Sequence, residues 1–190
     1  GYFLSANRDR SDGFYEHSGY RWTTAHAKIA YAPAPAARIS LTAGVSDGKQ
    51  HDPVLGYPEF WDDMRQERDY QRLLLEIAPS DALEIELEGR RHQFDALIED
   101  VYPDRREVFN DYTDETWGGG ARLRYGMGKD GALTLGFDGD WGTYDWHGYD
   151  RTYYTGNWAL YTLQTVIAGP VSINAGARYD RNRDFGSEVS

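Results

Sequence analysis

An alternation with a period of two residues constrains this chain more than any other feature of its sequence. The clearest run alternates leucine or isoleucine with glutamate: Leu83, Glu84, Ile85, Glu86, Leu87 and Glu88. An amphipathic helix repeats its apolar side chains about every 3.6 residues, whereas a strand sends successive side chains to opposite faces. The run therefore predicts a strand with one apolar face and one charged face.

The same alternation recurs along most of the chain. Clear examples are residues 38–46, 117–125, 133–141 and 171–180, and weaker ones are 2–8, 25–31, 70–77 and 158–167. We expect about nine strands, most of about 8–12 residues, which is the length that crosses a bilayer when a strand is tilted. No segment shows the pattern of a long helix.

The connections between these segments alternate between short and long. Short turns are expected at residues 33–36, 79–81, 128–131 and 169–170, and long polar connections at 9–24, 47–66, 95–115, 142–155 and after 180. An antiparallel up-and-down meander produces this order when all its long loops lie at one end. Transmembrane β-barrels have such loops, with tight turns on the periplasmic side and long loops outside.

Composition narrows the function classes. The net charge of −11 argues against a nucleic-acid partner, because phosphate binding requires a basic face. The absence of cysteine excludes disulfides, thiolate zinc sites and iron–sulfur clusters. No apolar run of 18 residues is present, which excludes a transmembrane helix. A mean hydropathy of −0.72 beside 15% aromatic residues fits strands that are apolar on one face only.

The charged positions of the alternation form one face of the expected sheet: Glu84, Glu86, Glu88, Arg122, Arg124, Asp138, Asp140, Arg178 and Asp180. Alternation alone does not say which face points inward. Tyrosine and tryptophan near the expected strand ends favour a membrane barrel with its apolar face outward, because these residues gather at headgroup level. They are Tyr31, Trp117, Tyr125, Trp141, Trp158 and Tyr179. The alternative is the general preference of aromatic residues for strands.

Several segments resemble strands and loop entries of TonB-dependent outer-membrane receptors. They are residues 176–180 (Gly-Ala-Arg-Tyr-Asp), 184–188, 10–15, 17–20 and 27–33. Gly56, Tyr57 and Pro58 are similar to a loop position of siderophore and cobalamin receptors. The resemblance extends over the whole chain at the level of strand and loop spacing.

This resemblance implies a barrel of 22 strands with an N-terminal plug domain, energised through TonB. We expect residues 1–190 to be a partial barrel domain without the plug and the TonB box. The implied parent protein lies in the outer membrane of a Gram-negative bacterium and imports a scarce nutrient, foremost an iron–siderophore complex. Its implied partners are outer-membrane lipid, a metal chelate (siderophore, cobalamin or haem) and the TonB complex, which would act through the missing N-terminal region. No cofactor is implied.

The long loops carry the candidate ligand-binding residues. These are Tyr57, Phe60, Trp61, Tyr102, Arg105, Arg106 and Tyr149, on three of the long connections. Aromatic stacking and hydrogen bonding from such side chains would hold a bulky chelate. The alternative is that these loops are ordinary acidic, solvated segments.

No motif indicates a metal site or a catalytic residue. The five histidines His17, His26, His51, His92 and His147 are dispersed, and Asp138-Gly139-Asp140 lacks the remaining ligands of a calcium loop. Gly118-Gly119-Gly120 precedes no Lys-Ser/Thr pair, so it makes room in the barrel or bends a strand. Asp62 and Asp63 with His51 suggest the rim of an outer-membrane protease only weakly. A passive porin and a soluble β-sandwich binding module remain as alternatives.

Overall fold

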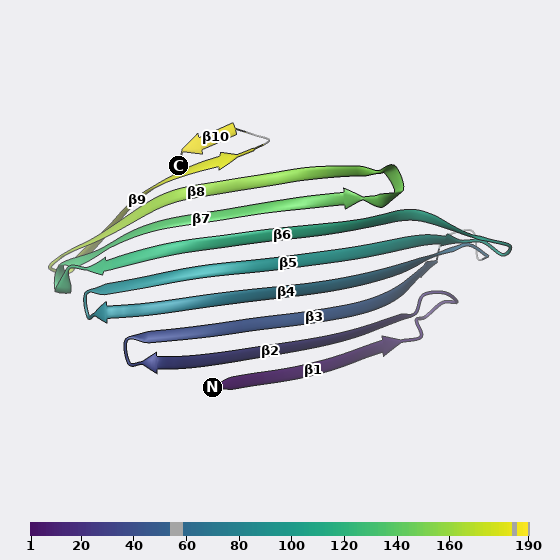
Figure 1. The fold of residues 1–190 in the computed structure, drawn as a ribbon, viewed down its shortest axis with the longest axis horizontal. Coiled ribbons are helices and arrows are strands. Elements are labelled where there is room, and N and C mark those ends of the chain that lie inside the picture. The colour runs from purple at the N-terminus through teal and green to yellow at the C-terminus, as the bar shows by residue number, and fades with distance from the viewer. Residues whose placement is uncertain (54–58, 184–185, 190) are drawn as a thin grey trace.

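Ten antiparallel strands form a single sheet in which each strand pairs with its neighbours in sequence (Figure 1). The computed structural model describes residues 1–53, 59–183 and 186–189. The strands are β1 (Tyr2–Ser11), β2 (Tyr20–Ala34), β3 (Ala37–Pro53), β4 (Trp61–Ser80), β5 (Leu83–Val101), β6 (Arg106–Gly126), β7 (Gly131–Trp146), β8 (Arg151–Ala168), β9 (Val171–Asn182) and β10 (Gly186–Val189). This is the predicted all-β, up-and-down architecture, with one strand more than expected.

The connections alternate between the two ends of the sheet, as predicted, but their lengths overlap: four residues separate β6 from β7, and four also separate β5 from β6 and β7 from β8. The turns after β2, β4, β6 and β8 all lie at one end of the sheet, on the left of Figure 1. Two residues separate β2 from β3, β4 from β5, and β8 from β9. The only helical segments among the described residues are two single 3₁₀ turns, Gly128–Asp130 and His147–Tyr149. Within those residues, no helix is long and apolar enough to cross a membrane.

The predicted strand lengths are wrong for β2–β8, which have 15 to 21 residues. The predicted loop 95–115 shrinks to residues 102–105, and residues 142–155 shrink to 147–150. The backbone ladder continues into these segments, but apolar and polar side chains no longer alternate there: Ala96, Leu97 and Ile98 follow one another, and aromatic side chains lie on the inner face. Because the apolar alternation stops before the hydrogen bonding does, the sequence pattern marks only part of each strand.

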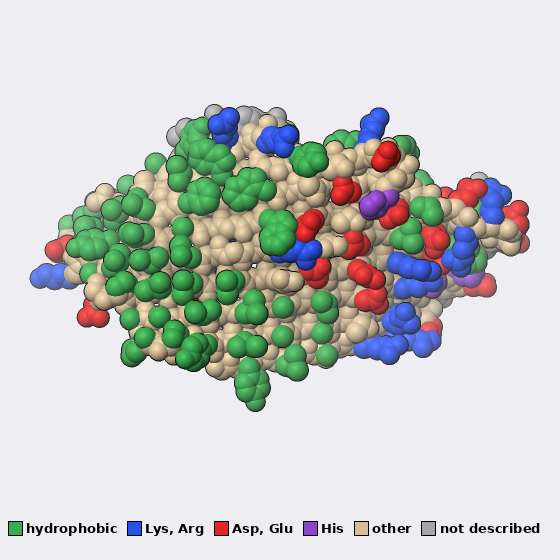
Figure 2. All heavy atoms as spheres, viewed as in Figure 1, with side chains coloured by type: hydrophobic (Ala, Val, Ile, Leu, Met, Phe, Trp, Pro, Cys, Tyr) green, Lys and Arg blue, Asp and Glu red, His purple; other side chains and the backbone are tan. Residues whose placement is uncertain are grey.

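One face of the sheet carries an apolar band. Pairing places Ile39 opposite Leu75, Leu75 opposite Leu87, and Leu123 opposite Leu135. These side chains are not covered by any second layer: Ile29 is 59% exposed and Ile173 is 58% exposed. Figure 2 shows hydrophobic side chains spread over the end with the short turns, and charged side chains gathered toward the other end. We call the face of the sheet that carries the apolar band the outer face, and the opposite face the inner face.

The apolar band has the height of a membrane. On β3 it runs from Ala37 to Val45, which is about 27 Å along the strand. Because barrel strands tilt by about 35–45°, this length corresponds to about 19–22 Å of membrane thickness, which is comparable to the lipid-facing band of about 25 Å in transmembrane barrels. The strands extend well beyond the band at the end with the long connections.

The aromatic residues mark the limits of the band rather than the ends of the strands. Tyr31 and Tyr125 lie beside the short turns, as predicted. Trp117 and Trp141 are directly paired but lie in the interior of β6 and β7, where the band ends. The expectation that these tryptophans end their strands is therefore wrong, because the strands continue past the membrane level.

The inner face carries the predicted charges, and neighbouring strands pair them. Arg122 donates to Glu86 at 2.7 Å and Arg124 to Glu84 at 3.2 Å, both between β6 and β5. On β9, Arg178 contacts Asp180 at 2.9 Å and lies 3.7 Å from Asp138 of β7. Charges of both signs thus satisfy one another across a polar surface.

A glycine allows the longest of these links. Arg90 of β5 reaches across β6 and donates to Asp140 of β7 at 2.7 Å, and it also donates to Glu88 at 3.2 Å. It passes over Gly118 of β6, where an added Cβ would lie 2.6 Å from the Arg90 Nε atom. The prediction that this glycine run makes room inside the barrel is confirmed at Gly118.

Replacing Gly118 by valine should break this link. The new side chain would displace Arg90 from Asp140, and we expect the full-length protein to lose about 1–3 kcal/mol of unfolding free energy. Denaturant unfolding followed by tryptophan fluorescence measures the change. Gly89→Val is the matched control, because an added Cβ at Gly89 meets nothing within 4 Å. Equal loss in both variants would show that strand glycines matter only for backbone conformation.

Candidate ligand-binding surface beyond the apolar band

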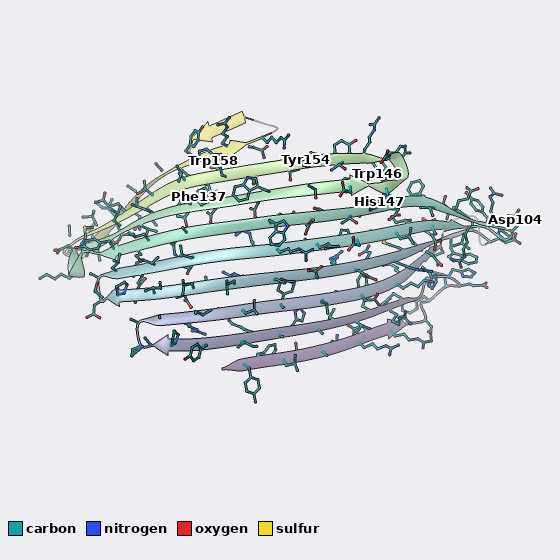
Figure 3. The ribbon with its side chains drawn as sticks, in the orientation of Figure 1. Asp104, Phe137, Trp146, His147, Tyr154 and Trp158 are labelled. Carbon is teal, nitrogen blue, oxygen red and sulfur yellow. The ribbon has the colours of Figure 1, made fainter. Side chains whose placement is uncertain are left out.

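The extended ends of β4, β5 and β6 bring together most of the residues expected to bind ligand. Phe60 packs on Tyr102 with ring centroids 4.8 Å apart, and the Arg105 guanidinium lies 4.4 Å from the centre of the Tyr102 ring. The Tyr102 amide donates to the Arg105 carbonyl at 2.9 Å, which closes the short connection. Figure 3 shows Asp104, within this connection, at the far tip of the molecule.

Asp63 organises the base of this tip. Its side chain is fully buried and accepts hydrogen bonds from Arg106 Nη1 at 2.7 Å, Lys49 Nζ at 3.2 Å and Trp61 Nε1 at 3.2 Å. His51 Nδ1 makes a further short contact with the same carboxylate. One carboxylate therefore links β3, β4 and β6.

The electrostatics of Asp63 follow from these partners. Burial by itself would raise the pKa of the carboxyl, but hydrogen bonds from Arg106, Lys49 and His51 outweigh it and lower the pKa to about 2. In return, the hydrogen bond to Asp63 raises the pKa of Arg106. Trp61 also stacks on His17, with ring centroids 3.5 Å apart, so the connection between β1 and β2 joins this group.

The inner face at the same level carries a row of aromatic side chains. Phe94 and Tyr112 have ring centroids 5.7 Å apart, Tyr112 and Tyr144 5.1 Å, and Tyr144 and Tyr153 6.2 Å. The Arg68 guanidinium lies 4.7 Å from the centre of the Phe94 ring. The row therefore crosses four strands, from β5 to β8, and is bounded by a cation on β4.

The alternation in the sequence does not predict this aromatic row. Tyr112, Tyr144 and Tyr153 lie in segments that were expected to be loops, and Phe94 directly precedes one of them. The available signal was the presence of tyrosines at matching positions of consecutive segments, and only the register reveals that match. For example, Tyr144 lies directly opposite Tyr153.

Three carboxylates lie side by side above the aromatic row. Asp52 is opposite Asp62, and Asp62 is opposite Asp100. Burial, followed by the charge and hydrogen bond of Asp100 and then the charge of Asp52, raises the pKa of Asp62. Among the described residues no group of three or more His, Cys, Asp or Glu side chains has the arrangement of a metal site. The histidines are likewise separate.

The structure thus unites five of the seven predicted ligand-binding residues at one tip: Phe60, Trp61, Tyr102, Arg105 and Arg106. Tyr149 belongs to the connection between β7 and β8, where it packs on Trp146 with ring centroids 4.4 Å apart. Figure 3 places Trp146 and His147 at the end of β7, apart from Asp104. Tyr57 lies outside the described residues.

Solved structures share this arrangement of strands. A siderophore receptor, PirA from Pseudomonas aeruginosa, matches with a TM-score of 0.77 and 13% identity, over 99% of this chain and 32% of that one. The ferric-catecholate import receptor Fiu from E. coli K12 matches with a TM-score of 0.73 and 12% identity, over 95% of this chain and 37% of that one. The copper transporter OprC matches with a TM-score of 0.72 and 17% identity, over 95% of this chain and 32% of that one.

The chain has the fold of a receptor barrel. The resemblance to TonB-dependent receptors is confirmed at the level of this fold, and the chain spans about a third of the length of the receptors that it matches. The described sheet does not close, so the receptor-barrel fold is present as a stretch of consecutive strands. No protein-family model matches the sequence, and no curated protein matches it either.

The Asp63 carboxylate gives a pH prediction. Its pKa lies at about 2 in the folded protein, below its usual value of 3.8, so its stabilising contribution is complete above pH 4 and is lost as the pH falls from about 4 to 2. Trp61 reports on this contact. We expect the fluorescence difference between the wild type and Trp61→Phe to change with a midpoint below pH 3. A midpoint near pH 4 would mean that Arg106 and Lys49 do not hold the carboxylate in solution.

Proposed function

We propose that this chain is part of the barrel of a TonB-dependent receptor in the outer membrane of a Gram-negative bacterium, which binds and imports a metal chelate. The observation that carries the proposal is the combination of the receptor-barrel fold with an aromatic inner face beyond the membrane band. Open sheet edges are not tolerated in lipid, because unpaired backbone groups there have no water to bind. Further strands of the parent protein would therefore pair with β1 and β10.

The chemistry of the inner face suits a bulky, polar ligand. Phe94, Tyr112, Tyr144 and Tyr153 offer ring faces for stacking and, in the tyrosines, hydroxyl groups for hydrogen bonding. Arg68 adds a positive charge at one end of the row, whereas the charge of Arg105 at the tip is already paired with Glu107 at 2.7 Å. Anionic iron chelates, such as ferric catecholates, combine aromatic rings with negative charge and fit this surface. Binding is non-covalent, and the proposed receptor makes and breaks no chemical bond.

An iron–siderophore complex is the preferred ligand, and copper, cobalamin and haem are the competing ones. Two of the similar structures are siderophore or ferric-catecholate receptors and one is a copper transporter. The described residues contain no cluster of metal-ligating side chains, which favours a metal that arrives inside a chelate over a bare ion.

Transport by the full-length protein tests the proposal. We expect a strain that lacks other receptors to take up radiolabelled ferric siderophore only when it carries both this protein and TonB. Labelled haem, cobalamin and copper, tested in parallel, identify the ligand class. Passage of small uncharged solutes without TonB would identify a porin instead, and a protein that stays monodisperse without detergent would identify a soluble module.

Substitutions in the aromatic row test where the ligand binds. The double variant Tyr112→Ala/Tyr144→Ala removes two stacking faces, so we expect the dissociation constant of the imported chelate to rise about tenfold. Quenching of tryptophan fluorescence by the chelate measures this constant. Tyr31→Ala is the control, because Tyr31 lies on the outer face beside a short turn and is 65% exposed. Unchanged affinity in the double variant would place the ligand elsewhere.

A further inference from the structure

Four cationic side chains form an uninterrupted row across the outer face. Arg10 of β1 lies opposite Arg21 of β2, Arg21 opposite Lys49 of β3, and Lys49 opposite Arg65 of β4. Like charges directly opposite each other on neighbouring strands repel and destabilise the pairing. Carboxylates of the chain contact three members of the row, Arg10, Lys49 and Arg65, whereas Arg21 makes no ion pair in the described part of the chain.

The row lies just beyond the membrane band. On β2 the outward positions run Tyr31, Ile29, Ala27, Ala25, Thr23 and Arg21. Arg21 is thus about 13 Å along the strand from Ala25, on the same face and toward the long connections. Figure 2 shows Lys and Arg side chains gathered near that end of the molecule, next to the area of hydrophobic side chains.

The cations surround an open groove of about 610 Å³. Its basic lining includes Arg8, Arg10, Arg21 and Lys49, with His51 beside them. Asp12 is the only acidic side chain among the lining residues, and it is 85% exposed and already paired with Arg10 at 2.9 Å. The described lining of the groove therefore carries an excess of positive charge from Arg8 and Arg21, although the chain as a whole is acidic.

Two of these cations have no internal partner. Lys49 is held by Asp63 at 3.2 Å, and Arg65 lies 3.9 Å from Glu99. In the part of the chain that the structure describes, Arg8 and Arg21 make no ion pair. On β3 and β4, Asp47 and Glu67 lie one outward position closer to the band than Lys49 and Arg65. The excess of positive charge is consequently concentrated on β1 and β2.

We propose that this groove binds the phosphate group of an anionic lipid of the outer leaflet, with the acyl chains lying against the apolar band of β1–β3. The inference rests on the membrane placement in the proposed function, but not on the transported ligand. Guanidinium groups donate paired hydrogen bonds to phosphate, and basic side chains beside a membrane attract anionic headgroups. The groove and the band are continuous on one face, so a single lipid molecule can satisfy both.

Lipid binding by the full-length protein tests this inference. The protein in detergent is titrated with lipid A that carries both phosphates, or with lipid A from which one phosphate has been removed. Native mass spectrometry measures how much of each lipid is bound. We expect preferential binding of the first. The variant Arg8→Gln/Arg21→Gln should bind it roughly tenfold or more weakly, since two headgroup contacts are lost. These substitutions leave the ion pairs of Arg10, Lys49 and Arg65 in place.

The matched control removes two exposed cations elsewhere, in Lys129→Gln/Arg151→Gln, and should bind lipid A as the wild type does. Equal binding by the Arg8/Arg21 variant and the wild type would overturn the inference. Displacement of the lipid by an equal concentration of inorganic phosphate would also overturn it, because the site would then serve a free anion. Chelate uptake by the Arg8/Arg21 variant should match the wild type, so the lipid site and the transport function fail or succeed separately.

Discussion

The pairing of every backbone N–H and C=O group is the constraint on which the rest of this structure depends. In a hydrocarbon environment an unpaired peptide group costs several kcal/mol, so strands that cross it must be hydrogen-bonded on both edges. The uninterrupted order from β1 to β10 meets this demand for all the interior strands. Once the ladder is fixed, the side chains have only two faces to occupy, and the two faces meet different solvents.

The separation of the two faces explains why charges pair as they do. An ion pair on the outer face within the band would have to lose its hydration, whereas the inner face keeps contact with water. Arg122 and Arg124 accordingly find carboxylates on the neighbouring strand β5, and Arg178 of β9 lies 3.7 Å from Asp138 of β7 on the same inner face. Gly118 allows the same kind of ion pair across a whole strand, because the missing side chain on β6 lets Arg90 of β5 reach Asp140 of β7.

The sequence predicted the parts of the fold in which the two solvents differ most. Where lipid faces water across the sheet, as at Leu83 to Glu88, the alternation is clear and the strand, its phase and its charged face were all predicted. Beyond the band apolar and polar side chains occur on both faces, so residues 95–101 and 106–115 gave no alternation and were expected to be loop, although they are strand. The tip residues Phe60, Tyr102 and Arg105 were found because aromatic and basic residues stood out in polar segments. The row from Phe94 to Tyr153 was missed because its members are far apart in the sequence and only the strand pairing brings them side by side.

Register also explains why two rows of like charge on this sheet have different consequences. Asp52, Asp62 and Asp100 repel one another on the inner face, and burial together with this repulsion raises the pKa of Asp62. A carboxylate can relieve such repulsion by taking up a proton when the pH falls. Arginine does not lose its proton in proteins. Arg10 and Arg21 therefore stay charged at any physiological pH. Asp12 contacts Arg10 at 2.9 Å, whereas Arg21 has no carboxylate partner among the described residues. Because Arg21 lies on the face that continues into the apolar band, the headgroup of a lipid is the anion that we propose for it.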